Sequence, residues 1–343
     1  MADTGRGYAV GDVNVLLGLT GVYVKRAGDP LWRMVPASAF SPPLTIALSS
    51  WAQDVHAVPN TGIAYISWRD DYRSLVYKTM NYGNTWFNVS PINPILYGIR
   101  YAVTFKDMSE GIIVGEGPGR VHRTVDGGQN WTSYTIPVSE PLADAKHSGF
   151  YWNVSGGGNT FYRFNPISNR WLDFSIPLSP EFFPTHLKMS WVDDDRGFIS
   201  GYNQNGPNHV LKTTNGGMTW EAMPTQPPFA RAPSGHKGIW FFDSTKGWAA
   251  SLYNEFAYTS NGGYSWDVYP PQIIGGKTYA PLNKLVFLNE AAGWAVGGNQ
   301  RDIGYPSVSD GWIFKWEGTQ RPDISTTTRD ARFDTLACDD YVD

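Results

Sequence analysis

Residues 212–224 read KTTNGGMTWEAMP, and this phrase returns at three other places in the chain. The other copies are KTMNYGNTWFNVSP (78–91), HRTVDGGQNWTSYTIP (122–137) and YTSNGGYSWDVYP (258–270). All four follow the pattern T-x-(D/N)-x-G-x-x-W. Self-similarity of this kind indicates an array of equivalent supersecondary units, so the number and size of the units come first.

The pattern describes a tight turn between two short strands. Its Asp or Asn can accept hydrogen bonds from backbone N–H groups across its own turn. Its Gly can adopt a positive φ, and its Trp supplies apolar area for packing between neighbouring units. We therefore expect a structural role for Asn81, Gly83, Trp86, Asp126, Gly128, Trp131, Asn215, Gly217, Trp220, Asn261, Gly263 and Trp266.

A second phrase precedes each turn: an apolar run, a polar patch, and then Gly before apolar and small residues. KLVFLNEAAGWAVGG (284–298) shows it best, and MSWVDDDRGFISG (189–201) repeats it. Three weaker copies retain a Trp, and the Trp residues of successive copies then lie 40 to 54 residues apart. They are Trp32, Trp86, Trp131, Trp171, Trp220, Trp266 and Trp316. Units of this length suit four strands and their turns.

The alternation within each unit has period two, and long stretches of period 3.6 are missing from the sequence. These patterns predict an all-β fold, a single seven-bladed β-propeller of four-stranded antiparallel blades over residues 1–343. The blades are predicted near 4–36, 54–91, 103–137, 147–177, 189–224, 238–270 and 284–318. The first copy begins at its second strand, GYAVG (7–11), so we expect residues 331–338 to supply the missing strand and close the ring.

The repeated pattern resembles the Asp-box, or BNR, repeat. This repeat occurs in the propellers of sialidases, sortilin-type receptors, some endoglucanases and photosystem II assembly factors. The chain is most similar to the last family, through GYAVGD (7–12) and GWAVGG (293–298) followed by the turn pattern. That resemblance implies a propeller that assists the assembly or stability of a larger complex. The motif indicates a fold rather than an activity, because function resides in sites grafted onto a fold.

Composition excludes several classes of function. The net charge is −4 over 343 residues, so the total charge gives no basis for non-specific binding to nucleic acid. One Cys excludes an internal disulfide framework. The run VNVLLGLTGVYV (13–24) is broken by glycines and is interpreted as strand material. We expect no signal peptide, membrane insertion, cofactor or metal, and a location in the cytoplasm or in a particle assembled there.

Ligand-binding residues are expected opposite the repeated turns, in the loops between second and third strands and between blades. The candidates are Trp68, Arg69, Asp70, Asp71, Tyr72, Arg73, Arg100, Tyr101, Arg120, Arg231, Tyr253, Glu255, Arg301 and Asp302. Arginines gathered there could hold a substrate carboxylate in two-point contact, as in sialidases. A glycosidase would also need a pair of suitably spaced carboxylates. The alternative interpretation is a solvated rim of mixed charge, and no catalytic residue is assigned.

Three functions remain open from the sequence. The first is a non-catalytic protein-binding scaffold, an assembly or structural component of a larger complex. Its aromatic loop residues would suit protein contact. The second is a structural or receptor-contacting protein of a phage virion or injection particle. The third is a glycan-binding or sialidase-like propeller.

Overall fold

The computed structural model describes most of the chain. The described residues are 6–11, 20–29, 31–44, 50–69, 74–91, 102–115, 117, 119–176, 188–201, 210–229, 236–251, 255–269, 282–298, 311–317, 323–328 and 333–338. Two compact units are distinguished. The first comprises Met1–Gly117, Val121–Tyr134 and Val286–Asp343, and the second comprises Pro118–Arg120 and Thr135–Leu285.

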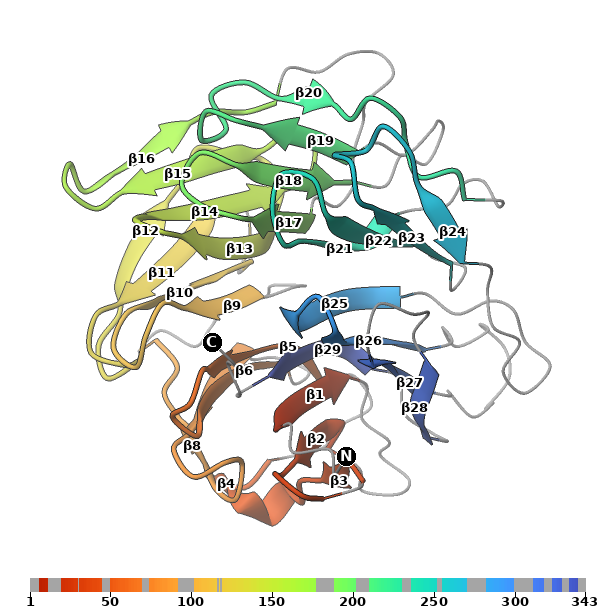
Figure 1. Cartoon of the computed structure of the whole chain (residues 1–343). Coiled ribbons are helices and arrows are strands. Elements are labelled where there is room, and N and C mark those ends of the chain that lie inside the picture. Colours follow the sequence, from red (N-terminus) through yellow and green to blue (C-terminus); the bar gives the residue numbers. More distant parts are fainter. Residues whose placement is uncertain are drawn as a thin grey trace, which may run out of the picture. The chain divides into compact units, whose positions relative to one another are not determined.

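The described part of the first unit is built from short antiparallel sheets (Figure 1). One sheet has the order β29 (Phe333–Cys338), β1 (Gly7–Gly11), β2 (Val22–Lys25) and β3 (Arg33–Met34). Another has β12 (Thr132–Thr135), β11 (Arg120–Thr124), β10 (Gly111–Val114) and β9 (Ala102–Phe105). A third has β25 (Leu282–Asn289), β26 (Ala292–Gly298), β27 (Gly311–Glu317) and β28 (Asp323–Thr328), and the division between the units falls within β25.

The fourth sheet of this unit has five strands. Its order is β4 (Phe40–Ser41), β8 (Trp86–Asn88), β7 (Ser74–Thr79), β6 (Ile63–Arg69) and β5 (Trp51–Val58). The extra strand β4 follows the 3₁₀ turn η1 (Ala37–Ala39) and pairs with β8 in parallel. The buried Phe40 ring stacks on Trp86 at 5.9 Å. The expectation of four strands in every unit of the repeat is wrong for this sheet.

The second unit contains three four-stranded antiparallel sheets in consecutive strand order. The first is β13 (Leu142–Ser148), β14 (Tyr151–Gly156), β15 (Phe161–Asn165) and β16 (Arg170–Asp173). The second is β17 (Lys188–Trp191), β18 (Gly197–Ser200), β19 (Val210–Thr213) and β20 (Glu221–Ala222). The third is β21 (His236–Phe241), β22 (Gly247–Ser251), β23 (Phe256–Thr259) and β24 (Asp267–Tyr269). Four-stranded antiparallel sheets are thus confirmed as the repeated unit in six of the sheets described.

Close packing of an aromatic ring on glycine explains the second repeated phrase. In the sheet β21–β24, Phe241 ends the first strand and pairs with Gly247 at the start of the second. A Cβ at Gly247 would lie 2.4 Å from the Phe241 ring, so only glycine leaves room for the ring. The pairs Phe105–Gly111, Trp191–Gly197 and Phe287–Gly293 repeat this arrangement. In three of these sheets the Trp of the turn pattern packs edge-on against the same ring, as Trp266 does on Phe241 at 6.4 Å.

The four turns that carry the T-x-(D/N)-x-G-x-x-W pattern share one set of hydrogen bonds. The Thr hydroxyl accepts from the Gly backbone N–H at 2.9–3.0 Å. The side-chain Oδ1 of the Asp or Asn accepts from the backbone N–H four residues further on at 2.8–3.0 Å. The residue before that Gly donates to the first-to-second turn of the same sheet, as Gly127 N–H does to Ser109 O at 2.7 Å. Both turns are therefore held together at one end of each sheet, called here the turn end.

The terminal strands pair with each other, as expected from the sequence. β29 lies antiparallel to β1, with Gly7 opposite Cys338 and Ala9 opposite Leu336. The predicted span 331–338 therefore supplies the neighbour of GYAVG. Closure of all the sheets into one ring stays a prediction.

The last copy of the repeat is placed differently from expectation. Trp316 lies on β27, where it pairs with Gly293, and the outer strand of this sheet is β28. In the sheet β21–β24, by comparison, Gly247 pairs with Thr259 of the turn pattern. Trp316 therefore takes the place of that Thr rather than of the box Trp. Ending the last copy at residue 318 was wrong because a fourth strand follows.

Candidate functional site

The predicted binding residues were expected at the end of each sheet opposite the turn end, called here the loop end. Of the fourteen candidates, the structure describes four: Trp68, Arg69, Arg120 and Glu255. The other ten lie outside the described residues: Asp70, Asp71, Tyr72, Arg73, Arg100, Tyr101, Arg231, Tyr253, Arg301 and Asp302. Their role in binding stays a prediction.

Trp68 does not present its ring to a partner. The residue is 1 % exposed, and its ring lies 6.4 Å from Phe40 in the core of the five-stranded sheet. Nearly every side chain of β6 is buried, so this strand has no solvent side along most of its length. The expectation that Trp68 is an exposed contact residue is wrong, because the added strand β4 brings Phe40 over it.

Glu255 is also buried, at 1 % exposure. Its backbone N–H donates to the Ser251 hydroxyl, and that hydroxyl donates to Glu255 Oε2 at 3.2 Å. The Ser251 N–H in turn donates to the Glu255 carbonyl at 3.0 Å. These contacts close the connection between β22 and β23. The exposed catalytic or binding role considered for Glu255 does not fit this position.

Arg69 and Arg120 keep positions at the loop end. Arg69 is the last residue of β6 and pairs with Ser74, the first residue of β7. Arg120 opens β11 and is exposed. Each guanidinium is thus carried by a strand terminus rather than by a free loop, which fixes its point of attachment.

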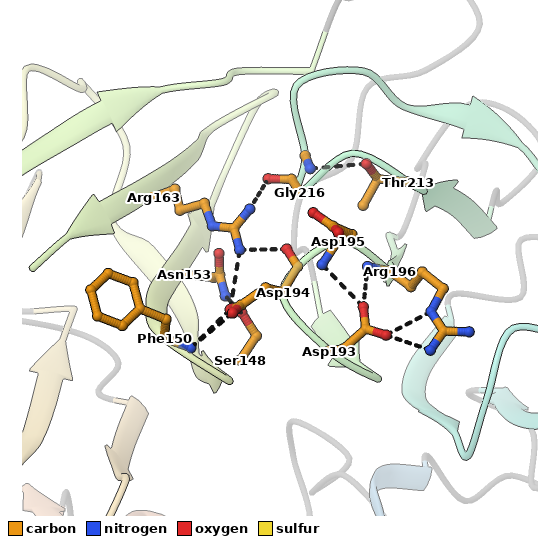
Figure 2. Close-up of polar contacts among 11 residues, drawn as sticks. Ser148, Phe150, Asn153, Arg163, Asp193, Asp194, Asp195, Arg196, Thr213 and Gly216 are labelled. Carbon is orange, nitrogen blue, oxygen red and sulfur yellow. Dashed lines mark hydrogen bonds and ion pairs between the residues drawn. The ribbon is translucent and has the colours of Figure 1, made fainter.

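The best-defined polar cluster of the second unit lies at the turn end, away from the predicted loops (Figure 2). Arg163, on β15, reaches into the neighbouring sheet β17–β20. Its Nη1 donates to the Gly216 carbonyl at 2.8 Å, and its Nη2 donates to the Asp194 carbonyl. Asp194 belongs to the turn between β17 and β18, and Gly216 belongs to the turn pattern between β19 and β20. One guanidinium therefore ties both turns of one sheet to the sheet before it.

The Asp194 carboxylate completes this cluster. Its Oδ1 lies 3.5 Å from Arg163 Nη2 and accepts from the Phe150 N–H at 2.9 Å. Ser148 donates its hydroxyl to the same oxygen at 3.4 Å, and Asn153 Nδ2 donates to Ser148 at 2.8 Å. Figure 2 shows these side chains converging from two sheets. The carboxylate is about one-third exposed, so water shares its charge.

Aromatic rings enclose the Arg163 guanidinium. Its Cζ lies 3.8 Å from the centroid of Tyr151 and 5.5 Å from that of Trp191. Burial lowers the pKa of Arg163, and the charge of Asp194 partly opposes that shift. A buried arginine that contacts backbone carbonyls and ring faces holds sheets together. Both Nη atoms donate to the protein itself, which fits a role in holding the two sheets together.

The first unit repeats the same device with lysine. Lys78 Nζ, on β7, donates to the Gly127 carbonyl of the next turn at 3.1 Å and lies 5.3 Å from the Tyr65 ring centroid. The Tyr65 ring stacks on Phe105 at 3.5 Å. Lys78 and Arg163 thus occupy equivalent positions in their sheets. Sequence reasoning missed both, although the basic residue before the turn pattern was a usable signal for Lys78.

Exposed apolar side chains mark the third-to-fourth turns. Each of the six such turns that the structure describes carries one large apolar side chain between 58 % and 84 % exposed. These side chains are Leu31, Met80, Val125, Ile167, Met218 and Tyr264. The sequence predicted only a structural role for these turns. Apolar side chains at turn tips add nothing to the core, whereas they can contribute to contact with another protein.

Metal ligands do not cluster in the part of the chain that the structure describes. Among the described residues, no group of three or more His, Cys, Asp or Glu side chains is placed to hold a metal ion. In the same part of the chain, no helix is long and apolar enough to cross a membrane. The contact of the Asp193 carboxylate with the Arg196 guanidinium braces a single turn. The side-chain hydrogen bond from Arg196 lowers the pKa of Asp193.

Searches against protein-family models and against curated proteins find no match to this chain. Solved structures do match. The structure of YCF48 bound to D1 peptide is 16 % identical, with a TM-score of 0.60 over 87 % of this chain and 88 % of that one. YCF48 from Cyanidioschyzon merolae is 18 % identical, with a TM-score of 0.65 over 87 % and 90 %.

A third similar structure is an enzyme. The GH74 xyloglucanase from Xanthomonas campestris is 14 % identical, with a TM-score of 0.65. It matches 99 % of this chain, which spans 53 % of the xyloglucanase. Identities this low carry the fold and no more. The comparisons and the repeated antiparallel sheets together show that the chain has a β-propeller fold.

Proposed function

We propose that this chain is a non-catalytic, protein-binding propeller that recognises a segment of a partner protein within a larger complex. The observation that carries the proposal is the fold likeness to YCF48 bound to D1 peptide, over 87 % of the chain. The four turns with the T-x-(D/N)-x-G-x-x-W pattern, which resemble Asp-box repeats, agree with it. The finer architecture proposed is a ring of seven blades, with the pairing of β29 and β1 as its seam.

The proposed binding surface is the loop end of the sheets. Arg69 and Arg120 are the described residues that support it, because both lie at strand termini on that end. Guanidinium groups favour carboxylates and backbone carbonyls of a bound segment. The partner proposed is therefore an extended peptide segment with acidic residues or a free carboxyl terminus.

A selection experiment tests this function without a known partner. A phage-displayed peptide library is selected on the immobilised protein, and the consensus peptide is synthesised and titrated by calorimetry. We expect acidic peptides whose affinity falls at least tenfold in the variants Arg69→Glu and Arg120→Glu. Arg170→Glu, an exposed arginine beside the turn end, is the matched control and should bind like the wild type. An absence of selected peptides, or equal loss in all three variants, contradicts the proposal.

A glycoside hydrolase is the second candidate, favoured by the fold likeness to the GH74 xyloglucanase. Of the loop carboxylates considered from the sequence, Glu255 is buried, and Asp70, Asp71 and Asp302 lie outside the described residues. Release of reducing sugar from xyloglucan by the wild-type protein, lost on replacement of Asp70 or Asp71, would favour this candidate over a scaffold. The virion role stays a prediction from the sequence.

A further inference from the structure

Two buried polar atoms beside the Arg163 cluster have no hydrogen-bond partner. They are Asn153 Oδ1 and Arg163 Nε. Asn153 is fully buried and Arg163 is 4 % exposed. Buried polar atoms are nearly always paired, because an unpaired one costs about 1–3 kcal/mol. Two orphans in one cluster therefore indicate a bound group that pairs with both.

The two atoms belong to directly opposed residues. Asn153 on β14 and Arg163 on β15 are partners in the strand register. Figure 2 places the Asn153 amide beside the Arg163 side chain, both pointing toward the Asp194 turn. The remaining atoms of these groups are already engaged: Asn153 Nδ2 with Ser148, and the two Nη atoms with Gly216 and Asp194. Oδ1 and Nε are the atoms of these two groups that make no hydrogen bond at all.

The chemistry of the pair selects the ligand. Arg163 Nε–H can only donate, and Asn153 Oδ1 can only accept. An anion would face the lone pairs of Oδ1, and a cation would face the positive guanidinium. The group that fits must accept one hydrogen bond and donate another in a space closed to solvent. We propose that one buried water molecule binds here, accepting from Arg163 Nε–H and donating to Asn153 Oδ1.

Such a water completes a closed set of hydrogen bonds. Arg163 contacts Asp194, Asp194 accepts from Ser148, and Ser148 accepts from Asn153. The water supplies the last link, from Arg163 to Asn153. Every donor then points along the network toward the Asp194 carboxylate, an arrangement in which neighbouring bonds polarise one another. The water would fix the guanidinium plane on the carbonyls of Gly216 and Asp194, and so act as a structural ligand of the joint between two sheets.

Crystallography of the wild-type protein tests the site directly and needs no variant. At a resolution near 1.5 Å we expect one spherical density peak at hydrogen-bond distance from both Arg163 Nε and Asn153 Oδ1, with low displacement parameters. A direct contact between those two atoms, or a dry gap, overturns the proposal. A flipped Asn153 amide would also overturn it, because Nδ2 would then face the Nε–H donor.

Nuclear magnetic resonance supplies an independent measurement in solution. The Arg163 Nε–H should give a cross-peak to a long-lived water and exchange with solvent at least a hundredfold more slowly than an exposed arginine. Arg170 is the matched control, since it begins the adjacent strand and is exposed. Equal exchange of the two Nε–H groups, or slow exchange without a water cross-peak, would count against a bound water.

Discussion

Replacing Arg163 by methionine tests whether a buried cation holds neighbouring sheets together. Methionine keeps an unbranched stem over Tyr151, so most of the apolar contact survives while the guanidinium is removed. The change leaves the carbonyls of Gly216 and Asp194 without their donors. Hydrogen bonds to a charged group contribute about 1.5–3 kcal/mol each.

The two bonds together would give about 3–6 kcal/mol, and relief of the buried charge offsets part of that sum. Asp194 is about one-third exposed and regains water, so its ion pair adds little to the loss. We therefore expect Arg163→Met to lower the free energy of unfolding by about 3–4 kcal/mol, at the low end of the range for breaking a buried ion pair.

Urea unfolding followed by tryptophan fluorescence measures this loss, with two transitions fitted separately where they occur. Arg170→Met is the control: this exposed arginine lies on the next strand, and its loss should change stability by less than about 0.5 kcal/mol. A value for Arg163→Met within 1 kcal/mol of that control would refute the reasoning, because the guanidinium would then contribute no more than a surface charge.

Three further outcomes follow from the fold. Gly247→Ala should lower the free energy of unfolding by about 1–3 kcal/mol, because its Cβ would lie 2.4 Å from a Phe241 ring that stacks on Phe198 at 3.6 Å. Chemical denaturation should show a smaller loss in a Phe241→Leu background. Equal losses in the two backgrounds would contradict the packing argument. Asp126 accepts the Asn130 N–H, which with the other turn contacts lowers its pKa to about 2 from 3.8. Its stabilising effect is therefore complete above pH 4 and lost as the pH falls toward 2, so Asp126→Asn should flatten the acid side of the melting-temperature profile, and an unchanged slope would argue against it. Deleting residues 330–343 removes β29 and its pairing with β1, and should lower the melting temperature by at least about 5 °C in calorimetry; an unchanged melt would dismiss this strand as a stabilising element.

Features fixed by local chemistry were predictable from the sequence. The turn pattern predicted four hairpins because Thr, Asp or Asn, and Gly satisfy one another's hydrogen bonds within a few residues. The second phrase, an apolar run and a polar patch before Gly, was a usable signal for the first hairpins, since its ring and glycine face each other across adjacent strands. The terminal strand was also predictable, because residues 333–338 repeat the composition of other first strands and β1 had no sequence-adjacent neighbour to fill that edge.

Features fixed by distant segments were not predictable. Strand β4 has no equivalent in the other copies of the repeat and pairs with a strand more than forty residues away. The repeat pattern therefore could not predict it. Phe40 of this strand covers Trp68, and the sequence alone gave no sign of that contact, so Trp68 was predicted to be an exposed loop residue. Arg163 and Arg170 look alike in the sequence, yet only the first meets carbonyls 31 and 53 residues away. The buried Glu255 likewise pairs with the Ser251 hydroxyl, and the period-two alternation of the strands does not predict which serine meets this carboxylate.

The bonding of the turn end argues for recognition at the loop end. At the turn end, the side-chain oxygens of Asp126 and its equivalents accept hydrogen bonds from their own backbone. Lys78 and Arg163 donate their N–H groups to carbonyls of the neighbouring turn. Those turns also leave large apolar side chains exposed, as at Ile167 and Met218. Apolar tips can add contact area, but they discriminate poorly between partners because they make no directed bonds. Selective recognition of a peptide therefore needs polar groups outside these turns, and Arg69 and Arg120, at strand termini of the loop end, are the described candidates.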